Sequence, residues 1–121
     1  MNYKHSDIKE AYKKVGVEKG RVVLIKSDLR YLGNYDRPDK MAVLHAHFNS
    51  LSDLIDLAEG TLVVPTSSTF LCNTDTPFDP DKTPSERGVL SEYIRKQEGA
   101  IRSFHPFMSY TAIGKHASYI C

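Results

Sequence analysis

The sequence lacks the long apolar runs of a membrane protein. Its longest apolar stretches span only a few of the 121 residues, and the N-terminal segment MNYKHSDIKEA has no apolar segment like that of a signal peptide. We therefore expect a cytoplasmic protein with no membrane partner.

The sequence also has few cysteines and a small net charge. Lys and Arg number 16 and Asp and Glu 15, so the formal net charge is only +1, and no basic stripe runs along the chain. A nucleic-acid partner is therefore not expected. The two cysteines, Cys72 and Cys121, have neither CxxC spacing nor a nearby histidine ladder, which argues against a zinc site or a disulfide framework. We expect two free thiols and no bound metal.

Two apolar runs without alternation predict the centre of the fold. Residues 22–25 (VVLI) and 61–64 (TLVV, stopped by Pro65) have the pattern of strands that are covered on both faces. Between them, residues 41–58 keep helical spacing, either as one long helix or as two short ones divided near Ser50. A strand, helix and strand in this order is nearly always a parallel, right-handed unit.

The remaining segments complete one α/β domain over residues 1–121, because no repeat, linker or composition shift interrupts the chain. A first helix is expected from a Ser6 cap to Gly16, and another over residues 90–97, capped by Thr83 or Ser85 and ended by Gly99. Residues 101–104 and 110–113 are strand candidates. We predict a largely parallel sheet with helices on both faces.

Polar segments follow both central strands. KSDLRYLG (26–33) and PTSS (65–68) should lie near one another, because the carboxyl ends of parallel strands meet at one edge of a sheet. Their hydroxyls, backbone N–H groups and cations suit phosphates or a long polar chain such as pantetheine. Capped turns on a plain sheet explain the same residues equally well. No GxxxxGK[ST] or GxGxxG motif indicates a nucleotide site.

Four segments, in order and covering most of the chain, carry a family resemblance. They are GRVVLIKSDLRYLG (20–33), GTLVVPTSS (60–68), FDPDKTPS (78–85) and RSFHPFMS (102–109). In these segments the sequence closely resembles the aminoglycoside 3-N-acetyltransferase family. The resemblance implies acetyl-CoA as co-substrate, and it implies that the chain matches the N-terminal half of a larger family domain.

The resemblance also implies a set of site residues. The first segment would lie beside the pantetheine arm, the second would line the same cleft, and the fourth would form its other wall. His105 is the candidate for general-base work, although a histidine before proline on a short link is more often an orienting residue. The implied cofactor-binding residues are Lys26, Ser27, Asp28, Leu29, Arg30, Thr66, Ser68, Arg102, Ser103 and Ser109.

Two residues depart from the family pattern. Lys26 stands where His is usual, and Asp28 stands where a second Ser is usual. A carboxylate beside an anionic cofactor is unfavourable unless it faces an amine substrate or caps backbone N–H groups. Asp28 therefore indicates either an acceptor such as an amino sugar or a structural cap.

Two functional hypotheses follow. The first is an N-acetyltransferase that moves an acetyl group from acetyl-CoA to an amine of an aminoglycoside or amino sugar. The second is a truncated, non-catalytic module that binds CoA or assembles with another chain, because the family's general base lies in a later segment without a counterpart here. In either case the open edges of the sheet leave room for a homo-oligomer.

Overall fold

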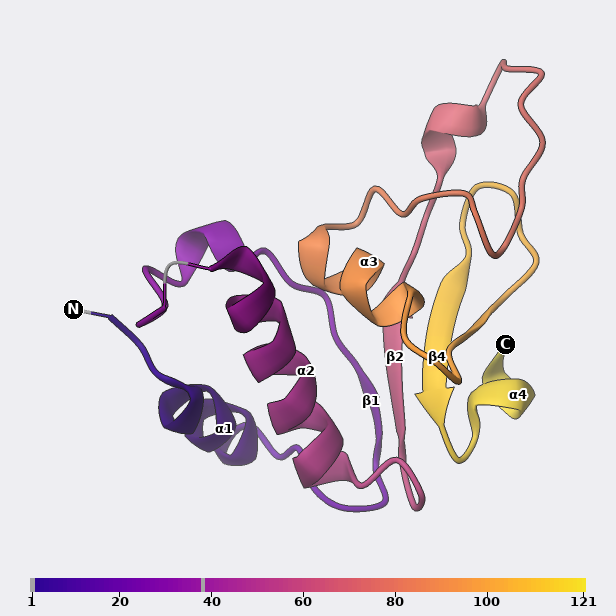
Figure 1. The fold of residues 1–121 in the computed structure, drawn as a ribbon. Coiled ribbons are helices and arrows are strands. Elements are labelled where there is room, and N and C mark those ends of the chain that lie inside the picture. Colours follow the sequence, from indigo (N-terminus) through magenta and orange to yellow (C-terminus); the bar gives the residue numbers. More distant parts are fainter. Residues whose placement is uncertain (1, 38) are drawn as a thin grey trace.

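The computed structural model describes residues 2–37 and 39–121, which form a four-stranded sheet with helices packed against it (Figure 1). None of the described helices is long and apolar enough to cross a membrane. Cys72 and Cys121 are free thiols. The elements are α1 (His5–Lys14), β1 (Val22–Leu24), the 3-10 turn η1 (Leu29–Tyr31), α2 (Lys40–Ile55), β2 (Thr61–Pro65), the 3-10 turn η2 (Thr69–Leu71), α3 (Val89–Arg95), β3 (Ile101–Arg102), β4 (Tyr110–Gly114) and α4 (Ala117–Ile120).

The sheet is mixed, with strand order β1-β2-β4-β3. The predicted strand, helix and strand unit is present: β1 and β2 pair in parallel, with α2 as the crossover. However, β4 is antiparallel to both β2 and β3, so the prediction of a largely parallel sheet was wrong. The physical reason is the short link between β3 and β4, since a parallel crossover needs about a dozen residues or more.

The two faces of the sheet are covered unequally. On one face Leu62, Val64 and Ile113 belong to a core cluster that α2 and α3 complete. On the other face Val63 and Ala112 pack against α4, a single helical turn. Among the described residues, helical layers on both faces are therefore not confirmed.

The two central strands also differ in burial. β2 is buried along its whole length, as its uninterrupted apolar run predicts. In β1, by contrast, Val22 and Leu24 are 54% and 53% exposed, so the prediction that this strand is covered on both faces was wrong here. The reason is the unequal cover of the sheet: Val22 and Leu24 share a face with their partners Thr61 and Val63, and on that face the single turn α4 packs on the central strands β2 and β4.

The helix α2 is one continuous helix, which decides between the two predicted alternatives. Asp39 caps it by accepting a hydrogen bond from Met41 N at 3.0 Å. Ser50, the expected start of a second helix, is buried inside it. The helix therefore continues without a break through Ser50.

The expected caps of the other two helices were wrong. The N-cap of α1 is Lys4 rather than Ser6, and the Asp7 carboxylate accepts a hydrogen bond from Lys4 N at 2.9 Å. The N-cap of α3 is Gly88, while Ser85 N donates to the Glu92 side chain at 3.0 Å. In both helices a first-turn carboxylate takes up a backbone N–H, which a search for Ser and Thr caps overlooks.

Arg102 connects three segments of the chain around the end of the sheet. Its guanidinium lies 4.9 Å from the centre of the Phe78 ring, and its burial lowers the pKa of the group. The positive charge is compensated by neutral oxygens rather than by a carboxylate. It donates to Ser109 Oγ at 2.9 Å, to the carbonyl oxygens of Thr66 at 2.7 Å and Pro80 at 3.4 Å, and to that of Thr83.

A buried histidine joins α1 to α2. His47 is only 3% exposed, and its Nδ1 lies 2.8 Å from the hydroxyl of Tyr12. Its Nε2 is buried and has no partner among the described residues. Burial lowers the pKa of His47 to about 4 and raises the pKa of Tyr12 to about 12.

We expect Arg102→Lys to lower the free energy of unfolding by about 2 to 4 kcal/mol, because an ammonium group cannot reproduce the planar fork that reaches three segments. Denaturant unfolding followed by circular dichroism measures the change. Arg21→Lys is the matched control, because the Arg21 side chain is 62% exposed and pairs only with nearby Glu18. Equal losses in both variants would contradict the structural role of Arg102.

Acid should destabilise the fold through His47. The unfolded chain takes up a proton near the ordinary pKa of 6.5, whereas the folded chain resists until about 4. Stability attributable to this group is therefore present above pH 6.5 and falls as the pH drops, by up to about 1.4 kcal/mol per unit. Urea unfolding at several pH values should show a flatter profile for His47→Gln than for the parent. His45→Gln, on an exposed position of the same helix, should keep the parent's profile.

Candidate functional site

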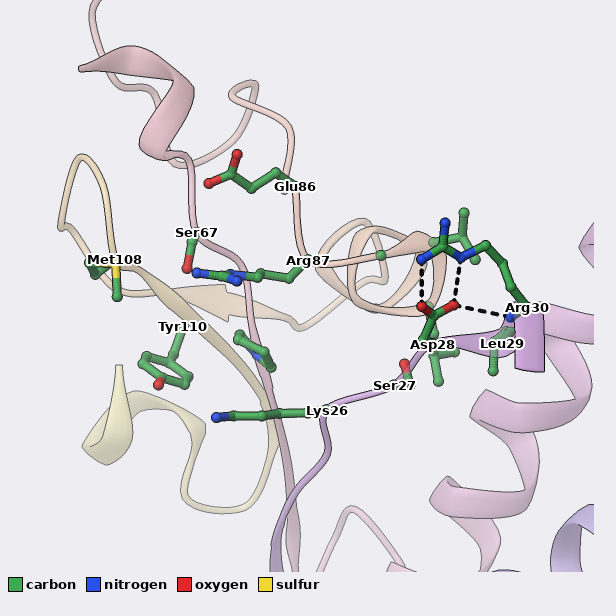
Figure 2. A pocket seen from close by; sticks show the side chains of 14 residues that line it. Lys26, Ser27, Asp28, Leu29, Arg30, Ser67, Glu86, Arg87, Met108 and Tyr110 are labelled. Carbon is green, nitrogen blue, oxygen red and sulfur yellow. Dashed lines mark hydrogen bonds and ion pairs between the residues drawn. The ribbon is translucent and has the colours of Figure 1, made fainter. Parts of the chain in front are cut away.

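A cleft of about 660 Å³ lies where β1 and β2 end (Figure 2). Its position follows from the parallel pairing of these strands, whose carboxyl ends lie at the same edge of the sheet. Its volume is within the range of ligand sites, about 300 to 1,000 Å³. The lining residues are Lys26, Ser27, Asp28, Leu29, Arg30, Pro65, Ser67, Glu86, Arg87, Gly88, Val89, Leu90, Met108 and Tyr110.

At one end of the cleft, Asp28 and Arg30 neutralise each other (Figure 2). Asp28 Oδ1 accepts from Arg30 N at 3.1 Å and from Nε at 2.9 Å, and Oδ2 accepts from Nη2 at 2.6 Å. The hydrogen bonds from the Arg30 side chain hold the pKa of Asp28 below its ordinary value. Asp28 thus caps η1, which is one of the two roles expected for a carboxylate at this position.

At the other end, two cations point across β2. The side chains of Lys26 and Arg87 extend in the same direction, toward Tyr110 and Ser67 (Figure 2). Neither cation forms an ion pair within the described part of the chain. We call Lys26, Ser67 and Arg87 the cationic end of the cleft.

Glu86 brings a negative charge near the cationic end, but its carboxylate is directed to another partner. It accepts hydrogen bonds from Thr69 N at 2.8 Å and from the Thr69 hydroxyl. The Thr69 hydroxyl is the main cause of a lowered pKa for Glu86, so the group stays ionised. The charges of Lys26 and Arg87 therefore remain available to a ligand.

The first predicted segment lies together in the cleft, since all of residues 26–30 line it. The second segment contributes a different residue from those expected. Thr66 and Ser68 are fully buried, while Ser67 between them lines the cleft. Side chains alternate along an extended chain, so a period of two counted from the cleft-facing Pro65 would have identified Ser67.

The predicted residues of the fourth segment lie behind the cleft wall. Arg102 and Ser109 are buried and bound to each other and to Thr66. Ser103 Oγ accepts from Tyr110 N at 2.9 Å, which holds the start of β4 against the end of β3. These residues shape the wall, and none of them lines the cleft.

His105 stabilises the turn between β3 and β4. Its Nδ1 accepts hydrogen bonds from Phe107 N at 3.2 Å and Met108 N at 3.0 Å, so the ring proton of the neutral form lies on Nε2. The side chain is exposed. It is connected to the cleft by its hydrogen bond with Met108, which lines the cleft. This geometry matches the orienting role, and catalysis by His105 stays a prediction.

Sequence reasoning missed Arg87, Met108 and Tyr110 as cleft residues. Arg87 comes from the loop before α3, and Met108 and Tyr110 come from the link before β4 and its first residue, where Tyr110 pairs with Pro65 at the end of β2. The described residues also contain no group of three or more His, Cys, Asp or Glu side chains that could hold a metal ion.

The fold occurs in solved structures, including those of aminoglycoside acetyltransferases. The YokD protein from Bacillus subtilis superposes with a TM-score of 0.84 at 27% identity, over 99% of this chain and 50% of that one. The apoenzyme of aminoglycoside acetyltransferase AAC(3)-IVa gives 0.81 at 26% identity, over 99% and 44%. AAC-IIIb in a binary complex with CoASH, at 18% identity, shares the fold with a TM-score of 0.80 over 98% and 48%.

The present chain thus spans about half the length of these structures. The family pattern described as Aminoglycoside 3-N-acetyltransferase matches residues 24–121, which include all the residues that line the cleft. The chain belongs to the aminoglycoside 3-N-acetyltransferase family.

Proposed function

We propose that this chain binds acetyl-CoA in the cleft and forms the donor side of an N-acetyltransferase acting on an amine of an aminoglycoside or amino sugar. The observation that carries the proposal is the cleft itself. Residues 26–30, which match the family pattern, line it at the carboxyl ends of β1 and β2. Ligands of α/β folds bind at this place.

Two family members support the choice of ligands. AAC-IIIb was solved as a binary complex with CoASH. A variant of AAC(3)-IVa, which is 26% identical to this chain, was solved with a gentamicin and with apramycin. All three are ligands of those proteins, and we extend them to this chain as donor and acceptor classes.

The polar and apolar surfaces of the cleft fit an acyl carrier with a long, polar arm. Ser27 and the backbone around Leu29 offer hydrogen-bonding groups beside an apolar side chain, which suits the amides and methylenes of pantetheine. The pairing of Asp28 with Arg30 removes the repulsion that a lone carboxylate would exert on an anionic donor. Thr66, Ser68, Arg102, Ser103 and Ser109 act behind the wall, by holding its shape.

The proposed reaction is a direct transfer. The amine nitrogen bonds to the thioester carbonyl carbon, the carbon–sulfur bond breaks, and a base takes the amine proton and returns it to the departing sulfur, which leaves as the thiol of CoA. For His105 we propose a positioning role, because its Nδ1 is engaged by two backbone N–H groups of the turn that carries Met108. Hydrogen-bond donors aimed at the carbonyl oxygen would stabilise the developing negative charge.

We expect saturable binding of acetyl-CoA to this chain in titration calorimetry, weakened about tenfold by Arg30→Ala, which leaves the Asp28 carboxylate uncompensated in the cleft. Ser27→Ala should weaken binding to a smaller degree, since it removes one neutral hydrogen-bonding group. Arg21→Ala, whose partner is Glu18, is the control and should bind like the parent. A folded chain that does not bind acetyl-CoA would refute the proposal.

The transferase activity is tested by the product. Incubation of the chain with acetyl-CoA and either apramycin or glucosamine should yield an acetylated amine by mass spectrometry, with one CoA thiol released per product. Omission of the amine is the control for thioester hydrolysis. Saturable binding of acetyl-CoA without any acetylated product would favour the non-catalytic, CoA-binding alternative.

A further inference from the structure

We propose that the cationic end of the cleft is a phosphate subsite, in which Arg87 and Lys26 bind a phosphate group of the acetyl donor and Ser67 adds a hydroxyl. The inference rests on the proposed function and deepens it, because it names residues that select a phosphorylated acyl carrier over a plain pantetheine thioester. The family resemblance implies a cofactor-binding role for Lys26, but for neither Arg87 nor Ser67.

The backbone holds Arg87 in place from both sides. Glu86 N donates to Ser67 O at 3.0 Å, and Arg87 N donates to Ser85 Oγ at 3.1 Å. The next residue, Gly88, has a φ of +103°, and a Cβ there would lie 3.3 Å from Ser27 O. Residues 86–88 therefore lie against the segments that follow both β1 and β2, which fixes where the Arg87 side chain begins.

The charges at the two ends of the cleft then differ. Asp28 neutralises Arg30 at one end, whereas Lys26 and Arg87 at the other end have no ion pair within residues 2–37 and 39–121. Glu86, which precedes Arg87 in the sequence and also lines the cleft, is hydrogen-bonded to Thr69. Lys26 and Arg87 extend in the same direction within the cleft, Lys26 toward Tyr110 and Arg87 toward Ser67, so an ammonium, a guanidinium and a hydroxyl offer hydrogen-bond donors to the oxygens of a phosphate group (Figure 2).

The apolar wall beside this end limits which anion fits. Met108 and Tyr110 line the cleft there and are 51% and 38% exposed. An anion attached to an organic chain can contact this wall, whereas a free inorganic anion interacts only with the charged groups. A phosphate of coenzyme A, with its nucleotide or pantetheine attached, is thus the expected occupant.

The test compares three ligands that differ in their phosphates. Calorimetric titrations of the chain would use coenzyme A, dephospho-coenzyme A and pantetheine, with Arg87→Gln and Lys26→Gln as the variants. Each variant should weaken coenzyme A binding about tenfold or more, because a charge-assisted hydrogen bond is lost, and leave pantetheine binding unchanged. Added salt should weaken coenzyme A binding less in the variants than in the parent.

The third ligand identifies the phosphate. If the variants weaken coenzyme A but not dephospho-coenzyme A, the subsite holds the 3′-phosphate, and if they weaken both, it holds the pyrophosphate. Lys13→Gln is the matched control, since it removes one positive charge from the last turn of α1, outside the cleft.

Two results would overturn the inference while the proposed function stands: variants that bind coenzyme A as the parent does, and variants that weaken pantetheine and coenzyme A equally. In the second case the two residues would act on the shape of the cleft rather than on a phosphate. A folded parent chain that binds none of the three ligands would overturn both the inference and the proposed function.

Discussion

The parallel pairing of β1 with β2 is the constraint on which the site depends. Val22, Val23 and Leu24 pair with Thr61, Leu62 and Val63, so both strands end at one edge of the sheet. Their polar continuations, residues 26–30 and 65–68, leave the sheet together and form two sides of the cleft. A shift of this register by one residue would turn every side chain of one strand to the opposite face, and would therefore remove the cleft as well as the core.

Two glycines allow this register at the end of the strands opposite the cleft. A Cβ on Gly60 would lie 2.6 Å from Arg21 O, and one on Gly114, where φ is +126°, would overlap with Gly60 O. The backbones of β1, β2 and β4 approach too closely there for any side chain. Close backbone contact at one end of the sheet thus accompanies an open cleft at the other.

The positive charges around the cleft lie in three different environments. These environments distinguish a structural cation from cations that a ligand could reach. Arg102 is buried, and its charge is dispersed over carbonyl and hydroxyl oxygens. Arg30 is neutralised by a carboxylate two residues away. Lys26 and Arg87 are exposed and form no ion pair within the described residues. Arg102 is buried and Arg30 is exposed but paired, so of these four cations Lys26 and Arg87 are the ones that are both exposed and outside any ion pair of the described residues.

The sequence predicted the elements that local patterns determine. The runs 22–25 and 61–64, the helical spacing after Met41 and the polar segments at the strand ends all correspond to observed features. It failed for the direction of β4, which is set by the short link from β3, and for the starts of α1 and α3, whose N-caps are Lys4 and Gly88 rather than hydroxyl residues.

The residues of the candidate site also fall into two groups: those that local sequence patterns predict and those that depend on tertiary contacts. Residues 26–30 could be found from sequence because they directly follow a strand, and the whole segment lines the cleft. Arg87 could not, because its place beside Ser67 depends on the backbone hydrogen bond from Glu86 to Ser67, which joins segments that are distant in the sequence. Alternation along the chain after Pro65 does distinguish Ser67 from its neighbours, so that residue was accessible to sequence reasoning.

The residues that carry the family resemblance therefore serve two separate physical purposes. Those at 26–30 line the cleft, and of these only Leu29 also packs against the core cluster within the described residues. Those at 102–109, with Thr66 and Thr83, tie β3, β4 and the loop around Phe78 together through buried hydrogen bonds. A substitution in the second set alters the wall by destabilising the fold, so its effect on binding arises through stability. Only measurements that separate affinity from the folded fraction can therefore assign a motif residue of this family pattern to recognition.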